Sequence, residues 1–309
     1  MVTTRDVLEE YVKVFLTGAS GVVGRSAMSA LVEAGHDVVG LARSETAADT
    51  VRSFGARPHL GSIFETESLV AGMQDAEVVL NLVGNVPSGA ARFRPGAWRV
   101  HDRLRSHGAD VVVRAAAETG VRRVVQQSLS AVYADGGDDW IDEHDLVDVT
   151  AAAEPLVMAE TFAASHAATG GDSVVLRLGL LLGPEPMTRW WIRRARAGHP
   201  TGLGSPDGWT HVVHPDDIGT AAVHALTAPA GVYNVGAEPL RREELAEAFA
   251  IAGGRRGARF HAPATQRLLG HRLELYTRSQ RVSSQRFSDR TGWYPNHPKF
   301  TLDWFSHAV

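Results

Sequence analysis

The stretch that most constrains the fold runs from Lys13 to Gly24. It begins with an apolar run that is typical of a buried strand and continues into a turn with glycines at Gly18, Gly21 and Gly24. Residues 22–34 then have helical composition. Such a turn predicts a pyrophosphate site, because glycines let backbone N–H groups approach phosphates and a helix N-terminus favours negative charge. The Gly-x-x-Gly-x-x-Gly spacing is weak evidence alone, so the prediction depends on the strand before it and the helix after it.

Composition limits the classes of protein to which this chain can belong. Its 309 residues suffice for one large domain, or for a large domain with a smaller one attached. A formal net charge of −4 argues against a nucleic-acid binder, and the absence of cysteine excludes disulfides and thiolate metal ligands. We predict no metal site. No apolar run approaches the ~20 residues that span a bilayer, and residues 1–12 lack a signal-peptide core, so we expect a cytoplasmic protein without membrane association.

Apolar runs alternate with helical segments along the chain up to residue 182. The expected strands after the first are residues 37–42, 56–60, 77–83, 121–127 and 173–179. The expected helices are residues 22–34, 45–54, 97–118 and 151–168, with another beginning near residue 65. Near-continuous apolar strands suit a parallel sheet covered on both faces. The pattern therefore predicts an α/β fold, a Rossmann-type doubly wound parallel sheet.

The pattern changes after Gly183. A helix is expected at residues 189–196, and residues 210–214 are expected to return to the sheet before a last strand at 232–235. The remaining residues have the composition of a small mixed lobe. The predicted domains are a dinucleotide-binding domain of residues 1–182 and 210–236, and a small C-terminal mixed substrate lobe of residues 183–209 and 237–309.

Five segments, in order along the chain, resemble motifs of the extended short-chain dehydrogenase/reductases, the NAD-dependent epimerase/dehydratase group. They are the phosphate loop at 17–24, the fifth strand with its serine-bearing loop at 120–133, HVVHPDDI at 211–218, VYNVG at 232–236 and the C-terminal ending at 283–295. The resemblance covers nearly the whole chain. It implies the fold predicted above, a nicotinamide dinucleotide, a small-molecule substrate and a homodimer formed through the helices at 97–118 and 151–168.

The resemblance places the dinucleotide against the ends of several strands. The residues implied are Gly18, Ser20, Gly21, Val22, Val23, Gly24, Ser62, Ile63, Val83, Gly84 and Leu178. In such a fold an acid at the end of the second strand binds the ribose of NAD, whereas a cation accommodates the extra phosphate of NADP. Here that strand ends at Arg43 and Ser44 without an acid. Arginine can pair with a phosphate and stack on adenine, so we expect NADP(H) to be preferred over NAD(H); a solvated arginine is the alternative.

The residue pair that performs redox chemistry in this family is absent. A Tyr-x-x-x-Lys pair normally passes a proton while hydride moves at the neighbouring carbon, and the lysine lowers the tyrosine pKa. The resemblance puts the pair at Ala152 and Leu156, which cannot transfer protons. The motif occurs nowhere in the chain, whose lysines are Lys13 and Lys299. The ordinary acid/base pair is therefore missing.

Three functions remain possible for such a chain. The first is a reductase with another proton donor. The second is an enzyme that catalyses a non-redox isomerisation, cyclisation or elimination in the same pocket, and the third is a nucleotide-sensing binding protein like the NmrA-type regulators. The leading hypothesis is the first: an NADP(H)-binding oxidoreductase acting on a small, largely apolar or aromatic metabolite with a non-standard proton donor.

The catalytic candidates that replace the missing pair are Ser128, Tyr133 and His214. Ser128 ends the fifth strand, and the carboxyl ends of strands face the ligand crevice in such sheets. Tyr133 offers a phenolic proton, although the resemblance implies a tyrosine that packs near the pocket. His214 stands three residues from His211, a spacing that turns at most one of the two toward the pocket.

The predicted substrate pocket contains Ser130, Trp140, Trp191 and His211. Because adjacent tryptophans on a helix cannot share a face, Trp191 is expected to line the pocket while Trp190 packs in the core. Trp140 lies in an acidic loop that either holds a base over the cavity or is simply solvated. Three arginines on one helix face form either an anion site or a solvated basic surface: Arg189, Arg193 and Arg196.

Overall fold

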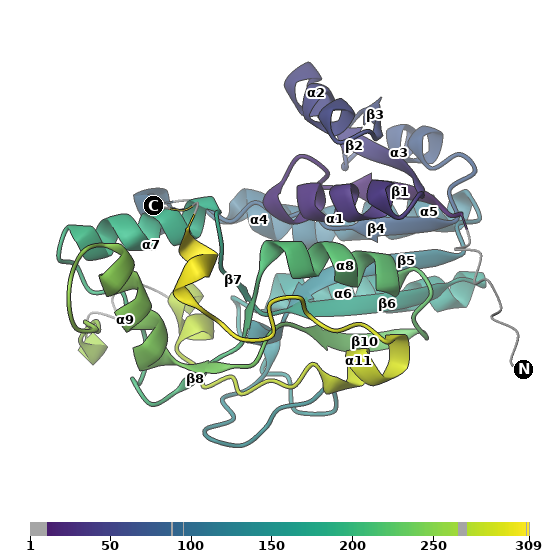
Figure 1. Cartoon of the computed structure of the whole chain (residues 1–309). Coiled ribbons are helices and arrows are strands. Elements are labelled where there is room, and N and C mark those ends of the chain that lie inside the picture. Colours follow the sequence, from purple (N-terminus) through teal and green to yellow (C-terminus); the bar gives the residue numbers. More distant parts are fainter. Residues whose placement is uncertain (1–10, 88, 95, 265–270, 307, 309) are drawn as a thin grey trace, which may run out of the picture.

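A seven-stranded parallel sheet forms the centre of the computed structural model, which describes residues 11–309 except 88, 95, 265–270, 307 and 309. Its strands are β1 (Lys13–Thr17), β2 (Asp37–Ala42), β3 (Arg57–Leu60), β4 (Val78–Asn81), β5 (Arg123–Leu129), β6 (Asp172–Leu178) and β10 (Gly231–Val235). They lie in the order β10-β6-β5-β4-β1-β2-β3 (Figure 1). This order confirms the predicted Rossmann-type doubly wound sheet. Successive strands are added on one side of β1 up to β3 and on its other side from β4 onward. Such folds bind ligands in the crevice at this switch point, between β1 and β4.

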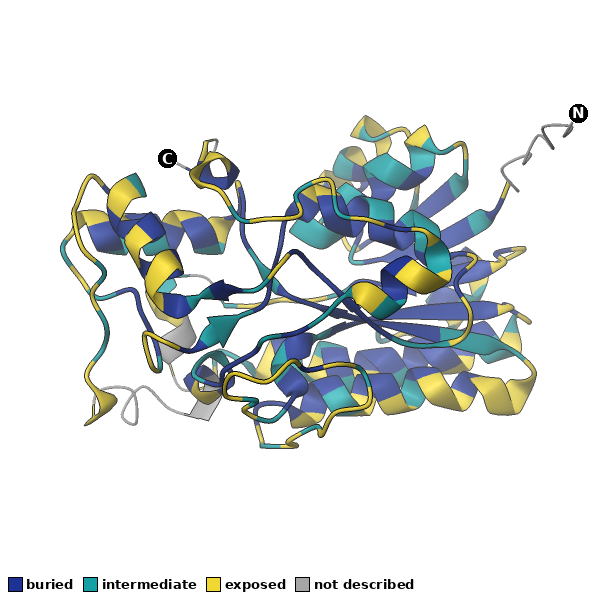
Figure 2. Cartoon of the chain, turned by 60° about the horizontal axis from the view of Figure 1, so that its bottom comes forward, coloured by how far each residue is buried: buried dark blue, intermediate teal, exposed yellow. Residues whose placement is uncertain are grey.

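Helices cover both faces of this sheet. On one face α1 (Val22–Glu33) packs along α8 (Pro215–Ala225), and on the other α5 (Ala109–Glu118) lies between α3 (Thr66–Gly72) and α6 (Glu154–Ser165). The helix α2 (Glu45–Ser53) connects β2 to β3. Alternate residues of β1 show why the strands are apolar throughout: Leu16 belongs to the core cluster under α1, and Phe15 belongs to the cluster on the other face. Figure 2 shows the strands buried and the helices exposing their outer sides.

The long helix predicted over residues 97–118 is interrupted. It comprises α4 (Arg99–Arg103), a π-helical turn at Leu104–Gly108, and α5. A π turn adds one residue to a helical turn and so changes which side chains face inward, and such turns are frequent at functional sites. Here the turn contains Arg105, which is buried.

Residues 210–214 do not rejoin the main sheet, contrary to the prediction. Instead β8 (Trp209–Thr210) pairs antiparallel with β11 (Leu240–Arg241), and β9 (Val212–Val213) pairs with β7 (Leu180–Leu181). These short ladders carry the chain across the carboxyl ends of the main strands before α8 begins. The expected strand at residues 232–235 does enter the sheet, as β10 beside β6.

A smaller lobe has its own apolar core. Its helices are α7 (Pro186–Arg196), α9 (Arg242–Ala252) and a 3-10 helix at Leu302–Phe305, and residues such as Ile192 and Phe249 fill the space between them. One part of the predicted lobe packs elsewhere: α11 (Gln285–Thr291) lies against β10, with Phe287 in the core of the main sheet. In the described part of the chain, no helix has both the length and the apolar character that crossing a membrane requires.

Candidate functional site

The glycine turn after β1 forms a cradle of backbone groups. Gly18 has φ +73°, and a Cβ atom there would lie 2.7 Å from the carbonyl oxygen of Leu82. A Cβ atom on Gly24 would lie 2.1 Å from the carbonyl oxygen of Gly18. Gly21 is the N-cap of α1, and no described side chain caps this helix. The first amides of α1 therefore have no side-chain partner among the described residues and are available to an anion.

A cavity of about 470 Å³ extends from this cradle across the strand ends to the smaller lobe. The predicted dinucleotide residues that line it are Gly18, Gly21, Val22, Val23, Gly84 and Leu178. The predicted pocket residues that line it are Ser130, Trp191 and His211. Trp190 is buried, and its ring packs edge-on against Trp191 with centroids 4.6 Å apart. The cavity thus joins the cradle to residues from both parts of the chain.

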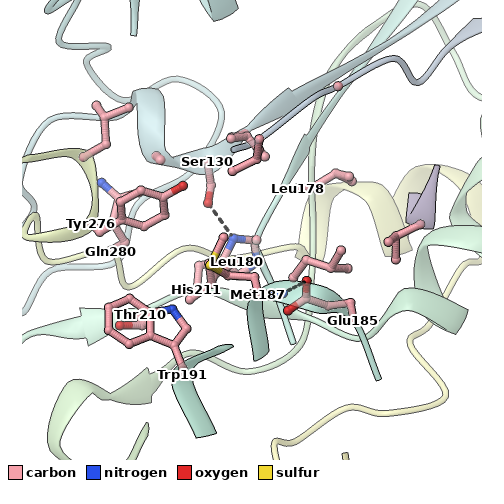
Figure 3. Close-up of a pocket in the computed structure, with 18 of the residues that line it drawn as sticks. Ser130, Leu178, Leu180, Glu185, Met187, Trp191, Thr210, His211, Tyr276 and Gln280 are labelled. Atoms are coloured by element: carbon pink, nitrogen blue, oxygen red, sulfur yellow. Dashed lines mark hydrogen bonds between the residues drawn. The ribbon is translucent and has the colours of Figure 1, made fainter. Parts of the chain in front are cut away.

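Ser130 and His211 form a hydrogen-bonded pair in the cavity wall (Figure 3). Ser130 begins a 3-10 turn directly after β5, and His211 lies between β8 and β9. His211 Nδ1 is 3.0 Å from Ser130 Oγ, and its Nε2 is 3.4 Å from Ser284 Oγ. The imidazole is 2% exposed, and burial lowers its pKa to about 3. His211 is therefore neutral at physiological pH and can donate one hydrogen bond and accept another.

Aromatic and aliphatic side chains form most of the remaining wall. The aromatic members are Trp191, Trp209, Phe249 and Tyr276. In Figure 3 the Tyr276 hydroxyl points toward the part of the cavity that contains Ser130. Glu185 lines the wall at the N-terminus of α7, where its carboxylate accepts hydrogen bonds from the amides of Met187 and Thr188. Burial raises the pKa of Glu185.

Ser128, one of the predicted catalytic residues, lies beneath the cavity rather than in its lining. Its hydroxyl donates to Glu160 at 2.5 Å, and the same carboxylate forms a salt bridge of 2.7 Å with Arg177. All three side chains are buried. This arrangement ties α6 to β5 and β6, and it leaves the Ser128 hydroxyl facing Glu160.

Tyr133 is held by similar interactions away from the cavity lining. Its phenol donates to Asn234 Oδ1 at 2.9 Å, and the Arg177 guanidinium lies 4.7 Å from the ring centroid. Burial raises the Tyr133 pKa to about 12. Trp140, predicted for the pocket, is 55% exposed and stacks with Arg281 outside the lining. The positions of these two residues give no support to the roles predicted for them.

His214, the third catalytic candidate, lies at the N-terminus of α8. Its Nδ1 accepts from the amide of Asp216 at 3.3 Å, so His214 caps this helix. Its ring stacks on His297 with centroids 3.9 Å apart, beside a second cavity. Ligand atoms of His214, Asp216 and His297 lie within 4.8 Å of one another. We assign no metal to them, because a metal shared by two imidazoles lies near the plane of each ring, whereas these rings are stacked.

The predicted adenine-side residues lie outside the cavity lining. Arg43 and Ser44 are exposed directly after β2, and Ser44 caps α2 by accepting from the Ala47 amide at 3.3 Å. Ser62 accepts from the amide of Phe64, and Ile63 is buried in the apolar core. The other predicted dinucleotide residues outside the lining are Ser20, Gly24 and Val83. Arg189, Arg193 and Arg196 are exposed on α7, outside the cavity lining.

Ala152 and Leu156, at the positions implied for the missing tyrosine and lysine, belong to an apolar cluster. They pack with Val132, Ala153 and Leu275, and Leu156 is 2% exposed. No described residue of this cluster carries a group that transfers protons.

A family model for the "NAD dependent epimerase/dehydratase family" matches residues 14–236. The chain belongs to this family. This match confirms the resemblance to the NAD-dependent epimerase/dehydratase group of the extended short-chain dehydrogenase/reductases. The match spans the glycine cradle, all seven strands of the main sheet and the Ser130–His211 pair.

Two relatives and one solved structure illustrate the similarity. A 3-diazoavenalumate denitrifying reductase of a Streptomyces species is 29% identical over 93% of this chain and 97% of its own length. A 4-hydroxy-2-methyl-3-oxo-4-farnesyl-3,4-dihydroquinoline-1-oxide ketoreductase of Stigmatella aurantiaca is 36% identical over 40% of this chain and 35% of its own. The structure of MoeE5 with UDP-glucose and NAD has a TM-score of 0.75 at 21% identity, covering 96% and 97% of the two chains.

The similarity to these proteins has different extents. The chain matches only 35% of the length of the ketoreductase, and 23% and 24% of the lengths of two uncharacterized proteins from Schizosaccharomyces pombe and Saccharomyces cerevisiae. It matches the denitrifying reductase almost throughout. The likeness to MoeE5 shows the shared fold.

Several polar residues of the cavity lining were not predicted from the sequence. Among them are Arg105, Glu185, Arg242, Tyr276 and Arg278. Arg105 lies in what reads as an ordinary helix with several other arginines, and only the π turn brings it inward. Tyr276 follows residues 265–270 in a segment with no motif of its own. The order of motifs could locate the lobe, but no local pattern distinguishes its lining residues from its surface.

Proposed function

We propose that this epimerase/dehydratase family member is an NADP(H)-dependent reductase of a small, largely apolar or aromatic substrate, with Ser130 as its proton donor. The single observation behind this proposal is one continuous cavity that contains both the glycine cradle and the Ser130–His211 pair. Two relatives named as reductases, one of them matched along almost its whole length, agree with reductive chemistry.

The cradle fits the pyrophosphate of a dinucleotide. Gly18 and Gly24 have no room for a Cβ atom, so the backbone comes closer there than any other residue allows. The uncapped first turn of α1 offers amides to an anion, and Gly84 and Leu178 continue the cavity toward Ser130. When bound, a nicotinamide supplies or accepts the hydride. Preference for NADP(H) is supported by Arg43, an exposed cation at the end of β2 without an acid beside it in the sequence.

Ser130, His211 and Ser284 form a chain of groups that can pass protons. In the tautomer with the proton on Nδ1, His211 donates to Ser130 Oγ and accepts from Ser284 at Nε2. The Ser130 hydroxyl is then left to donate into the cavity, where a substrate oxygen gains negative charge during reduction. As the Ser130 proton leaves for the substrate oxygen, His211 passes its Nδ1 proton to the serine oxygen and takes the Ser284 proton at Nε2. The partly exposed Ser284 then regains a proton from water.

The walls of the cavity favour an apolar substrate body. Trp191 and Phe249 come from the lobe, while Leu129 and Leu178 come from the ends of the main strands. Aromatic faces of this kind bind flat rings through stacked or edge-to-face contacts. Part of the cavity belongs to the cradle, so the substrate itself is small.

Nucleotide titration and a turnover assay test this function. Wild-type protein should enhance NADPH fluorescence and should oxidise NADPH in the presence of one or more aromatic aldehydes, ketones or enones. Gly21→Asp, which places a carboxylate in the cradle, should abolish NADPH binding. Ala164→Asp is the control, because Ala164 is exposed on α6, outside the cavity lining. Unchanged NADPH binding by Gly21→Asp would disprove the cradle, and product formed without loss of NADPH absorbance would indicate a non-redox enzyme.

A further inference from the structure

Three guanidinium groups among the described residues line the cavity while being almost wholly buried: Arg105, Arg242 and Arg278. Two of them are fully engaged by the protein. Arg242 donates to the carbonyl oxygens of Ser205, Trp209 and Arg278. Arg278 forms a salt bridge of 2.8 Å with Asp148 and also donates to the carbonyl oxygen of Tyr133 at 3.0 Å. These two arginines hold loops of the lobe in place.

Arg105 is different. Its Nη1 donates to the carbonyl oxygen of Gln127 at 3.0 Å, and its Nε has no acceptor among the described residues. Its Nη2 lies beside Gly84, 3.6 Å from where a Cβ atom would be, and donates to no described residue. The side chain is 2% exposed, and no described carboxylate lies within salt-bridge distance of it. One edge of the guanidinium, formed by Nε and Nη2, is therefore left without a partner.

This cation is charged under physiological conditions. Burial lowers the Arg105 pKa to about 10, which still leaves the group protonated at neutral pH. A buried charge without a counterion is strongly unfavourable, so proteins pair such groups. Glu185, the acid in the cavity wall, is engaged by the amides at the start of α7. Glu160 also acts on Arg105 electrostatically, but its carboxylate forms the salt bridge with Arg177. An anionic ligand in the cavity would supply the counterion that the described residues do not.

We infer that the substrate carries a carboxylate, or a comparable organic oxyanion, that binds Nη2 of Arg105. This inference rests on the proposed function and adds the chemical class of the substrate. A hydrogen bond from an arginine N–H group to a carboxylate is charge-assisted and is therefore stronger than one between neutral groups. Together with Trp191, Phe249 and Tyr276 in the same cavity, the site fits an aromatic or arylalkenoic acid. The other anion within reach is the pyrophosphate of the dinucleotide, so the experiment compares the two.

Calorimetric titration of the NADP⁺-saturated protein tests the inference. The probes are benzoate, trans-cinnamate and 4-hydroxycinnamate, each compared with its neutral amide. Wild-type protein should bind at least one acid about tenfold or more tightly than its amide, as expected for a charge-assisted hydrogen bond. Arg105→Met should lose this discrimination while its affinity for NADPH changes less than about threefold. Arg193→Gln, which removes an exposed charge from α7, should behave as wild type.

A stability measurement separates ligand binding from a merely structural role. Because Arg105 lacks a counterion, Arg105→Met should melt at the same temperature as the wild type or higher, and the acid should raise only the wild-type melting temperature. Equal binding of acids and amides by the wild type, or unchanged discrimination in Arg105→Met, would overturn the inference. A parallel loss of NADPH affinity would overturn it too, by assigning Arg105 to the pyrophosphate. If the protein binds NADPH normally but binds the acids no more tightly than their amides, the inference about the carboxylate is wrong and the proposed function stands.

Discussion

Ser130 Oγ lies 3.0 Å from His211 Nδ1, although 81 residues separate them in the chain. The serine follows the central strand β5, and the histidine lies in the segment between β8 and β9 that leads toward α8. Their contact fixes the position of that crossing segment relative to the strand ends. It also places a hydroxyl, next to a neutral imidazole, in the cavity wall of a chain whose sequence contains no Tyr-x-x-x-Lys motif.

Removing the Ser130 hydroxyl should slow catalysis without weakening cofactor binding. We expect Ser130→Ala to lower kcat by between about 10² and 10⁴, the usual contribution of a general acid. NADPH affinity should stay the same, because the cradle is formed by other residues. The assay follows NADPH oxidation with an aromatic substrate found in the turnover screen. Ser288→Ala, which removes a buried hydroxyl outside the cavity lining, is the control. A larger loss in Ser128→Ala than in Ser130→Ala would return the catalytic role to Ser128.

His211 should make stability depend on pH. Its folded-state pKa is about 3, below the value of about 6.5 expected in the unfolded chain. Between these values the unfolded chain binds more protons than the folded protein, so the free energy of unfolding falls as the pH drops below about 6.5. The loss amounts to about 2 kcal/mol between pH 7 and pH 5.

Urea denaturation at pH 7 and pH 5 measures this effect. In His211→Asn the decrease in unfolding free energy between the two pH values should be smaller than in the wild type by about 2 kcal/mol. His144→Asn, which removes an exposed imidazole, should keep the wild-type pH dependence. Identical pH dependence in His211→Asn and the wild type would contradict the assignment of a buried neutral imidazole.

The fold could be predicted from the sequence because its main determinants are local. Apolar runs, helix composition and the glycine turn each act over a few residues, and strand order then follows from the right-handed connections between parallel strands. The interruption at Leu104–Gly108 and the pairing of β9 with β7 were not predictable in this way. Both depend on contacts between distant segments.

The cavity was only partly predictable for the same reason. Ser130 and His211 could be named from their positions in motifs, and Trp191 from its place beside Trp190 on a helix; all three line the cavity. Arg105 could not, because an arginine in a basic helix normally faces water and nothing in the local pattern reveals its burial. Ser128 and Tyr133 carry reactive groups at the right place in the sequence, but side chains from α6, β6 and β10 have engaged those groups. The sequence shows which reactive side chains a segment contains, whereas packing determines which of them face a ligand.

Arg43 should determine the choice between the two nicotinamide cofactors. Arg43→Ala should weaken NADPH binding by about tenfold and leave NADH binding within about twofold, because only NADPH carries the phosphate that the cation can pair with. The modest size follows from the exposed position of the side chain. Fluorescence titration with both nucleotides measures the ratio, and Arg52→Ala on α2 is the control. Equal losses for NADPH and NADH would leave Arg43 without a role in specificity.

Restoring a lysine at the position of the missing pair should destabilise the protein instead of improving it. Leu156 is packed among Val132, Ala153 and Leu275, so Leu156→Lys buries an ammonium group without a counterion. We expect a loss of about 3 kcal/mol or more in the free energy of unfolding. Met158→Lys on the same helix is the matched control: its side chain is 38% exposed, and the change should cost less than about 0.5 kcal/mol. If urea denaturation found the two variants equally stable, the cluster around Leu156 would be open enough to admit a charged side chain, and a lysine there could again support a tyrosine at position 152.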